Sequence, residues 1–316
     1  MTKLNFDESK LINPGELSFQ EVGGINFLGL TLTGKSHLEK GKVCQDANYV
    51  RFTNKNHPTV VAAIADGVGS CALSNYGSSI AVKVSANYLT SVFKKLDISN
   101  TDDKEIGEHI RTAMQKALDA IEEEANINEQ LPYSYQTTLT LAMYDGNNLY
   151  YGHIGDDGIV ALTSDGKLSM ITTRIKGDEA SSVYPLQAGK QMWEVGKCIE
   201  PVDGFMMATD GILDSIVMSE KQNNRVYYPF MEPAFKGTDN IEIGKLYAKT
   251  MQDSNFRKKV TDDMTVVFVK NERVKNNPYR FDAKKWNDET EYYEKQLTEA
   301  LYSTPTDYYD NSHKRI

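Results

Sequence analysis

The stretch of residues 137–172, TTLTLAMYDGNNLYYGHIGDDGIVALTSDGKLSMIT, decides the fold class of this chain. Its apolar runs have the length of strands, and turn-forming residues, including the triplet Gly155-Asp156-Asp157, separate them. Asp-Gly between alternating apolar runs is a strong hairpin signal, because these residues accept the backbone of a tight turn. We therefore predict an antiparallel meander of four short strands, at residues 137–144, 147–154, 158–163 and 167–172.

Further strands and helices are predicted on both sides of the meander. The helix expected at 103–125 has an apolar stripe spaced by three and four residues, and Asp102 followed by Glu105 resembles a capping box at its start. Runs of strands and helices in this order predict a layered α+β fold. Strands broken by glycine are expected within 18–33, and single strands at 47–52, 59–65, 204–208 and 264–269. The other expected helices are 75–94, 241–253 and 282–302.

The composition changes near both ends of the chain and divides it into three expected parts. These are an N-terminal extension at 1–23, a domain at 24–271 and a charged, tyrosine-rich tail at 272–316. The helix expected in the tail has one face that carries Trp286, Tyr293, Leu297 and Leu301. This helix either packs on the domain or serves as a partner-binding or regulatory segment.

Composition excludes several classes of protein. The 316 residues carry a formal net charge of −9, which argues against a nucleic-acid binder with its usual basic patch. The three cysteines form no CxxC pair, so neither a zinc site nor a disulfide framework is predicted. The N-terminus has no signal-peptide pattern, and the longest apolar run, Val60–Ala65, is too short to span a bilayer. We expect a cytoplasmic protein that binds neither nucleic acid nor membrane.

Five aspartates stand where apolar strands are predicted to begin or end. A single aspartate in such a place is usually a turn residue or a helix N-cap. Five in the same setting indicate a cation, because carboxylates beside a core are costly unless something cationic compensates them. An all-oxygen set of ligands favours Mg²⁺ or Mn²⁺ over zinc. The five are Asp46, Asp66, Asp156, Asp210 and Asp262, the last of which is followed by Asp263.

The motifs around these aspartates resemble those of the PPM-type, or protein phosphatase 2C, family, and in particular its compact bacterial branch. The resemblance covers about Gly24 to Lys270, and all five motifs occur in the family's order. It implies a four-layer αββα sandwich, in which helices flank two antiparallel sheets and a two-metal site lies at one end. The motifs are Cys-Gln-Asp-Ala (44–47), Ala-Asp-Gly-Val-Gly-Ser (65–70), Gly-Asp-Asp-Gly (155–158), Ala-Thr-Asp-Gly (208–211) and Thr-Asp-Asp-Met-Thr (261–265).

The resemblance also implies a role for each matched residue. Asp66 would bridge two Mg²⁺ or Mn²⁺ ions, with the Gly67 carbonyl beside it on the first ion. Asp210 and Asp262 would bind the second ion. Asp46 would hold a metal-bound water, and Asp156 with Asp210 would serve the weaker third metal of many members.

The implied reaction is the hydrolysis of phosphoserine or phosphothreonine in a protein by a water that two metals activate. No nucleophilic side chain is needed. The partners that the resemblance implies are a phosphoprotein substrate and an opposing serine/threonine kinase.

Three positions depart from the family's pattern. Gln45 replaces a common glutamate, Val68 replaces the histidine proposed as general acid, and Gly41 replaces an arginine that holds phosphate. Cations in the preceding loop offer a substitute for that arginine, although an ordinary solvated loop explains them equally well. These candidates for phosphate binding are His37, Lys40 and Lys42.

Two other functions stay open at this point. A pseudophosphatase would use the fold to bind or sense a partner, although such a protein has no need of five carboxylates at strand ends. Another two-metal enzyme, such as a nuclease or cyclase, is less compatible with the acidic charge balance. Hydrolysis of p-nitrophenyl phosphate with and without Mn²⁺ would discriminate among the three.

Overall fold

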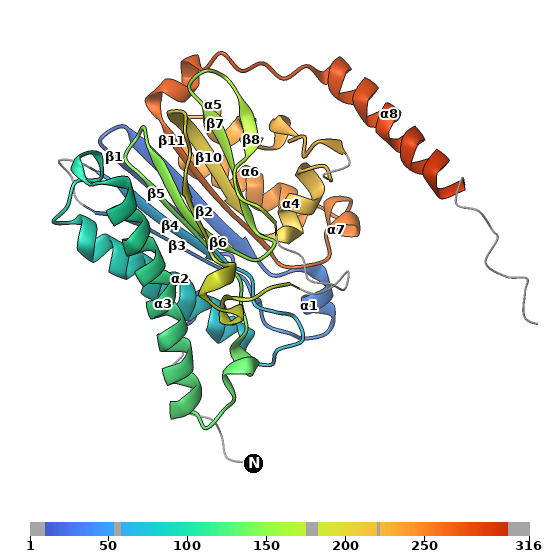
Figure 1. Cartoon of the computed structure of the whole chain (residues 1–316). Coiled ribbons are helices and arrows are strands. Elements are labelled where there is room, and N and C mark those ends of the chain that lie inside the picture. The colour runs from blue at the N-terminus through green and yellow to red at the C-terminus, as the bar shows by residue number, and fades with distance from the viewer. Residues whose placement is uncertain (1–9, 54–57, 175–182, 220–221, 303–316) are drawn as a thin grey trace, which may run out of the picture.

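The computed structural model describes residues 10–53, 58–174, 183–219 and 222–302, and it shows two stacked antiparallel sheets between helical layers (Figure 1). The predicted four-layer αββα sandwich is therefore confirmed. In the described residues one sheet has the order β1 (Ser18–Val22), β2 (Ile25–Leu32), β11 (Met264–Asn271), β10 (Val202–Ala208), β7 (Gly158–Thr163), β8 (Leu168–Met170). The other has the order β3 (Ala47–Phe52), β4 (Val60–Ala65), β5 (Leu139–Tyr144), β6 (Leu149–Ile154), β9 (Glu194–Lys197).

Helices cover the outer face of each sheet. The two long helices α2 (Ser74–Phe93) and α3 (Asp103–Ile127) pack over the sheet that contains β4. Shorter helices cover the sheet that contains β11, and the described part of the tail contains a helix of its own. The covering helices are α4 (Asp210–Ile216), α5 (Glu232–Lys236), α6 (Asn240–Gln252) and α7 (Phe256–Lys259). The helix of the tail is α8 (Ala283–Tyr302), and α1 (Lys35–Glu39) follows β2.

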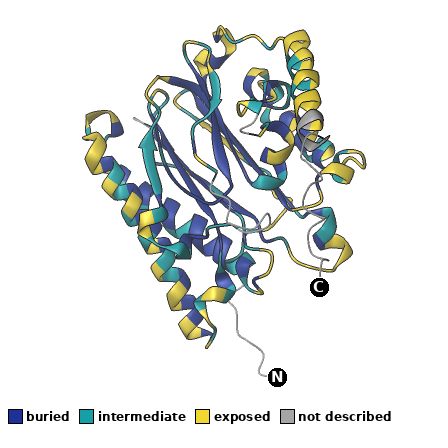
Figure 2. Cartoon of the chain, turned by 45° about the vertical axis from the view of Figure 1, so that its right-hand side comes forward, coloured by how far each residue is buried: buried dark blue, intermediate teal, exposed yellow. Residues whose placement is uncertain are grey.

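Three apolar layers explain why the central strands are continuous apolar runs. Along β4, Val61, Ala63 and Ala65 face the helices, whereas Val60, Ala62 and Ile64 face the other sheet. Successive side chains of a strand point to opposite faces, so a strand between two cores must be apolar at every position. The dark blue of the buried central strands in Figure 2 follows this pattern.

The prediction of one meander over residues 137–172 was wrong. The Asp-Gly turns do form hairpins, which pair β5 with β6 and β7 with β8. Between these hairpins the chain crosses from one sheet to the other at residues 155–157, so β6 and β7 do not pair. Gly155 permits the crossing with a φ of 119°, a conformation that side-chain-bearing residues rarely adopt. The alternation of apolar residues specifies strands and faces, but not the sheet that a strand joins.

The predicted helix at 103–125 is confirmed as α3. Asp102 caps it by accepting a hydrogen bond from the Lys104 backbone N–H. The predicted apolar stripe is buried against the five-stranded sheet and α2. Its members are Ile106, Ile110, Ala113, Ala117 and Ile121.

Parts of the expected extension and tail pack on the domain. Strand β1 forms the edge of the six-stranded sheet, and the Lys83 ammonium donates to the Lys10 and Leu11 carbonyls at 2.7 and 3.0 Å. In the tail, Val274 joins the core and the half-buried Trp286 lies under the Arg225 guanidinium. The side chains of Leu297 and Leu301 lie outside the described part. None of the described helices has the length and apolar character to cross a membrane.

Candidate metal centre

The register of the strands brings the predicted aspartates to one end of the sandwich. Ala47, the first residue of β3, pairs with Ala65, the last residue of β4, so Asp46 and Asp66 lie beside each other. Likewise Ala208, the end of β10, pairs with Gly158 and Val266 near the starts of β7 and β11. The residues that precede or follow these strands therefore lie at the same end of the sandwich, although they are far apart in the sequence.

Electrostatic repulsion acts among the carboxylates at this end of the sandwich. Burial raises the pKa of Asp46, Asp66 and Asp157 well above the usual range, and neighbouring aspartates raise each of them further. Burial raises the pKa of Asp210 to about 7, and the nearby Asp156 and Asp262 carboxylates contribute. The five predicted aspartates therefore form one electrostatic cluster, which Asp157 joins.

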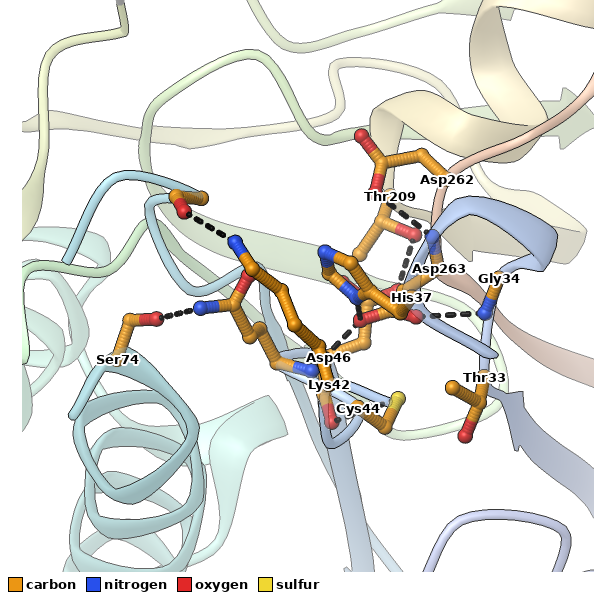
Figure 3. A network of polar contacts seen from close by, with 12 residues as sticks. Thr33, Gly34, His37, Lys42, Cys44, Asp46, Ser74, Thr209, Asp262 and Asp263 are labelled. Atoms are coloured by element: carbon orange, nitrogen blue, oxygen red, sulfur yellow. Dashed lines mark hydrogen bonds and ion pairs between the residues drawn. The ribbon is translucent and has the colours of Figure 1, made fainter. Parts of the chain in front are cut away.

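Two threonine hydroxyls fix the geometry of this cluster. Thr209 donates to Asp46 Oδ2 at 2.8 Å (Figure 3). It accepts from the Thr265 backbone N–H at 3.0 Å. On the other side, Thr138 donates to Asp157 Oδ2 and accepts from the Asp66 backbone N–H at 2.8 Å. Each hydroxyl thus connects the backbone at a strand end to a buried carboxylate. We refer to these two arrangements as the threonine relays.

The buried Asp263 carboxylate fixes two segments of backbone beside the aspartate cluster. Its carboxylate accepts hydrogen bonds from the backbone N–H groups of Gly34 and Gln45, each at 2.6 Å. The third contact is with His37 Nδ1 at 2.8 Å (Figure 3). Its neighbour Asp262 is exposed, and the Asp262 carboxylate accepts from the Asp263 N–H at 2.9 Å.

The structure separates the three cations proposed for phosphate binding. His37 is buried against Asp263, so it positions that carboxylate rather than standing at the lip of the site. Lys40 is exposed, and Lys42, also exposed, donates to the Gly69 carbonyl at 3.4 Å. Only the two lysines retain a solvent-facing position among these candidates.

An unpredicted cation, Arg174, lies on another side of the cluster. Its Nε donates to the Asp156 carbonyl at 2.7 Å, and its Nη2 lies 2.6 Å from Asp214 Oδ1. Both residues of this ion pair line a cavity of about 1030 Å³, together with Met170 and Met218. Arg174 follows strand β8 in a segment that matches no motif, so nothing in the sequence singled it out.

Close backbone packing explains several glycines near the aspartates. A Cβ on Gly34 would lie 2.2 Å from the Asp262 carbonyl carbon, and one on Gly211 would lie 2.1 Å from the Asp263 carbonyl oxygen. A Cβ on Gly67 would lie 2.8 Å from the Gln45 carbonyl oxygen. Such distances are far inside van der Waals contact, so these positions accept only glycine without a backbone shift.

The residues present fit a divalent cation of the Mg²⁺ or Mn²⁺ type. Asp157 Oδ1 and Gln45 Oε1 are buried, and neither has a hydrogen-bond partner in the described structure. Buried oxygens without a partner are costly, and hard cations or their waters satisfy such atoms. The nearby Cys44 is not a thiolate, because burial, Asp46 and Asp263 all raise the pKa of its thiol.

Sequence reasoning found part of this centre and missed the rest. The structure brings together Asp46, Asp66, Asp156, Asp210 and Asp262, with Gly67 directly after Asp66. The structure also includes residues that the sequence did not select, because their roles depend on distant partners. The one available signal was that each lies next to a selected aspartate or a strand end. These are Asp157, Asp263, Thr138 and Thr209.

Comparisons with known proteins agree with this geometry. A family model described as Protein phosphatase 2C matches residues 33–249, which is more than half of the chain. No curated protein sequence matches. Among solved structures, the serine/threonine phosphatase Stp1 from Staphylococcus aureus has a TM-score of 0.55 at 13% identity, over 83% of this chain and 100% of that one.

Two more solved structures have the same fold. The S. agalactiae serine/threonine phosphatase has a TM-score of 0.55 at 16% identity, over 78% of this chain and 100% of that one. The catalytic domain of the serine/threonine phosphatase PstP, solved with two manganese ions, has a TM-score of 0.52 at 17% identity, over 78% and 97%. On the match to the family model, the chain belongs to the protein phosphatase 2C family of protein serine/threonine phosphatases.

Proposed function

We propose that this protein hydrolyses phosphoserine and phosphothreonine in protein substrates with two bound Mg²⁺ or Mn²⁺ ions. The observation that carries the proposal is the cluster of buried and half-buried, mutually repelling carboxylates at one end of the sandwich. The relative PstP, which was solved with two manganese ions, supports the choice of metal. The ligands would be Asp66, the Gly67 carbonyl, Asp210 and Asp262, and Asp46 would hold a metal-bound water. Asp156 with Asp210 would hold a weaker third ion.

The described residues supply positioning rather than a nucleophile. Bound metal ions would activate water and neutralise charge on the phosphoryl group. The threonine relays hold Asp46 and the Asp66 backbone in fixed orientations, so little reorganisation is needed as charge develops. Val68 cannot donate a proton to the leaving serine or threonine oxygen, so we assign that step to water.

Metal removal tests this function directly. We expect that EDTA-treated protein hydrolyses neither p-nitrophenyl phosphate nor a phosphothreonine peptide, and that Mn²⁺ or Mg²⁺ restores both activities. Ca²⁺ should not restore them, because it prefers a larger and more flexible shell of ligands. The measurement is the initial rate of phosphate release after dialysis against each metal.

The outcomes separate the proposed function from its alternatives. Full activity in metal-free protein would exclude the two-metal mechanism. Tight Mn²⁺ binding without any hydrolysis would instead identify a pseudophosphatase. Cleavage of nucleic acid or nucleotide in preference to a phosphopeptide would favour another two-metal enzyme.

We further propose that Lys40 and Lys42 help to capture the substrate phosphate in place of the family's arginine. Both are exposed, and Lys42 extends over the loop that follows Asp66 (Figure 3). The Lys40→Ala/Lys42→Ala variant should raise KM for a phosphopeptide about tenfold and change kcat much less, since a cation at the lip contributes uniform binding. His37 is left intact, because its removal would disturb Asp263.

The control removes two exposed charges elsewhere. Lys94→Ala/Lys95→Ala, at the end of α2, should leave KM unchanged. An unchanged KM in the Lys40/Lys42 variant would show that the metals or another cation hold the phosphate. Arg174, beside Asp156, would then be the next position to test.

A further inference from the structure

The cavity beside Arg174 runs along the open edge of a sheet. Strand β8 is the last strand of the six-stranded sheet, and within the described residues no further strand pairs with it (Figure 1). Five consecutive residues, 170–174, line this cavity. Because successive side chains of a strand point to opposite faces, a cavity that borders five in a row follows the edge of the strand.

The packing on the two faces of this segment agrees with that arrangement. Met170 packs against the core that includes helix α4, whereas Ile171 packs against the core between the two sheets. The cavity borders both residues, so it follows the backbone rather than either face. We refer to this edge-lined cavity as the β8 groove.

The backbone along the groove is arranged to pair with another chain. The Ile171 N–H donates to the Ile159 carbonyl of β7 at 2.9 Å, so residue 171 directs its backbone groups into the sheet. Inward and outward groups alternate along a strand of an antiparallel ladder. Those of Met170 and Thr172 therefore point outward, where an extended peptide can pair with them as an added strand.

One end of the β8 groove opens at the proposed metal centre. Arg174 donates to the carbonyl of Asp156 at 2.7 Å. The opposite wall includes Asp214 of α4, the helix that begins with Asp210. A strand rises about 3.3 Å per residue, so Met170 lies about 13 Å further along the edge than Arg174. A chain in the groove therefore has one end at the metals and the other end beyond Met170.

Apolar side chains give the β8 groove its selectivity. Met170 and Met218 are partly exposed, and both line the groove together with Val217. Methionine side chains are flexible and polarisable, so they adapt to apolar side chains of different shapes. The groove therefore suits a chain that has an apolar residue a few positions away from the residue at the metals.

We propose that the substrate phosphoprotein binds in the β8 groove as an added antiparallel strand along residues 170–174. This inference rests on the proposed function and names its substrate class, which is an extended segment with an apolar residue about four positions after the phosphorylated residue. The apolar residue comes after, because a chain antiparallel to this edge runs from Arg174 toward Met170. The pairs within this sheet are antiparallel as well.

A leucine scan of a peptide substrate tests the selectivity. A phosphothreonine peptide of otherwise small polar residues carries a single leucine, which is placed in turn at each position on either side of the phosphothreonine. We expect KM to be about tenfold lower when leucine stands near the fourth position after the phosphothreonine, because part of its side chain becomes buried. Leucine before the phosphothreonine should leave KM unchanged.

A scan with N-methylated peptides tests the pairing of the backbones. One backbone amide hydrogen at a time is replaced by a methyl group in the residues that follow the phosphothreonine. Only every second residue of an added strand directs its backbone toward the edge. KM should therefore rise at alternate positions and stay level at the positions between them.

Variants connect the leucine preference to the groove. Met170→Ser/Met218→Ser should remove most of the preference, whereas Leu246→Ser, at a 45% exposed position of α6, should keep it. Each rate is divided by the rate with p-nitrophenyl phosphate and Mn²⁺, since this substrate has no peptide chain. Thermal melting checks that each variant is folded, and Met218→Ser alone takes the place of the double variant if that one is not.

The results distinguish this inference from the proposed function. Hydrolysis of all the peptides with equal KM, or an N-methyl effect without alternation, would overturn the groove and leave the phosphatase function intact. A leucine preference before the phosphothreonine would overturn the antiparallel docking. If neither phosphopeptide nor p-nitrophenyl phosphate is hydrolysed, the proposed function fails, and fluorescence anisotropy of the same labelled peptides then tests the groove by the same alternation in binding.

Discussion

Replacing Asp66 by Asn is expected to lower Mn²⁺-dependent phosphopeptide hydrolysis by more than about 100-fold, since residues that only support a metal ligand already cost 10- to 100-fold. Asp66 lies at the end of β4, and its carboxylate is repelled by Asp46, Asp210 and Asp157 together. In the proposed centre it bridges two ions, so Asn would remove a charge that both share. Steady-state kinetics at saturating Mn²⁺ measure the loss.

Two comparisons show whether this loss comes from the centre. Asp119→Asn makes the same change on the exposed surface of α3 and should leave kcat and KM unaltered. Asp156→Asn should bind the first two ions nearly normally and still turn over slowly. The apparent stability of metal-free Asp66→Asn should not fall, because the substitution relieves repulsion among buried carboxylates. Wild-type turnover in Asp66→Asn would show that the assignment of this residue is wrong.

Replacing Gly211 by Ala should abolish most activity by moving the backbone that carries Asp262 and Asp263. The added Cβ would lie 2.1 Å from the Asp263 carbonyl oxygen, and a backbone atom cannot move aside as a flexible side chain can. Overpacking of this kind costs about 1–3 kcal/mol. Because Asp263 holds the backbone of Gly34 and Gln45, the shift would spread to both sides of the centre. Urea unfolding of metal-free protein and Mn²⁺ titration measure the two effects.

Gly107→Ala provides a matched control on α3. There the nearest atom to the new Cβ is Val195 Cγ1 at an ordinary 3.7 Å. In a helix interior, Ala is favoured over Gly by up to about 1 kcal/mol, so this variant should be as stable as wild type or more so. If Gly211→Ala behaved like Gly107→Ala in stability and metal binding, the close packing of α4 against the start of β11 would not be needed for the centre.

Much of the fold followed from local patterns in the sequence. Strands β4, β10 and β11 were predictable because a short apolar run between turn residues is typical of a buried strand. Helix α3 was predictable because its stripe and its N-cap both depend on residues a few positions apart. The aspartates were predictable because each lies within two residues of a strand end, and the ends of neighbouring strands lie close together in a sheet.

Other features depended on which distant segments meet, which local patterns do not specify. Strands β6 and β7 are buried at almost every position on both faces, so their patterns do not assign either strand to a sheet, and only the tertiary packing separated them. His37 was selected as an exposed cation in a polar loop, but the fold buries it against Asp263, which lies 226 residues further along the chain. The roles of Thr138 and Thr209 likewise depend on the fold, because the sequence does not show that their hydroxyls contact Asp157 and Asp46.

The sequence by itself therefore determined the strand lengths, the faces of the helices and the chemical character of the site. Hydrophobic periodicity and turn chemistry act over a few residues, so they are visible along the chain. The tertiary structure decided the order of the strands, the crossing at Gly155 and the choice between adjacent carboxylates, such as Asp156 with Asp157 or Asp262 with Asp263. Burial and hydrogen bonding distinguish such neighbours, and both are set by residues that only the folded chain brings within reach.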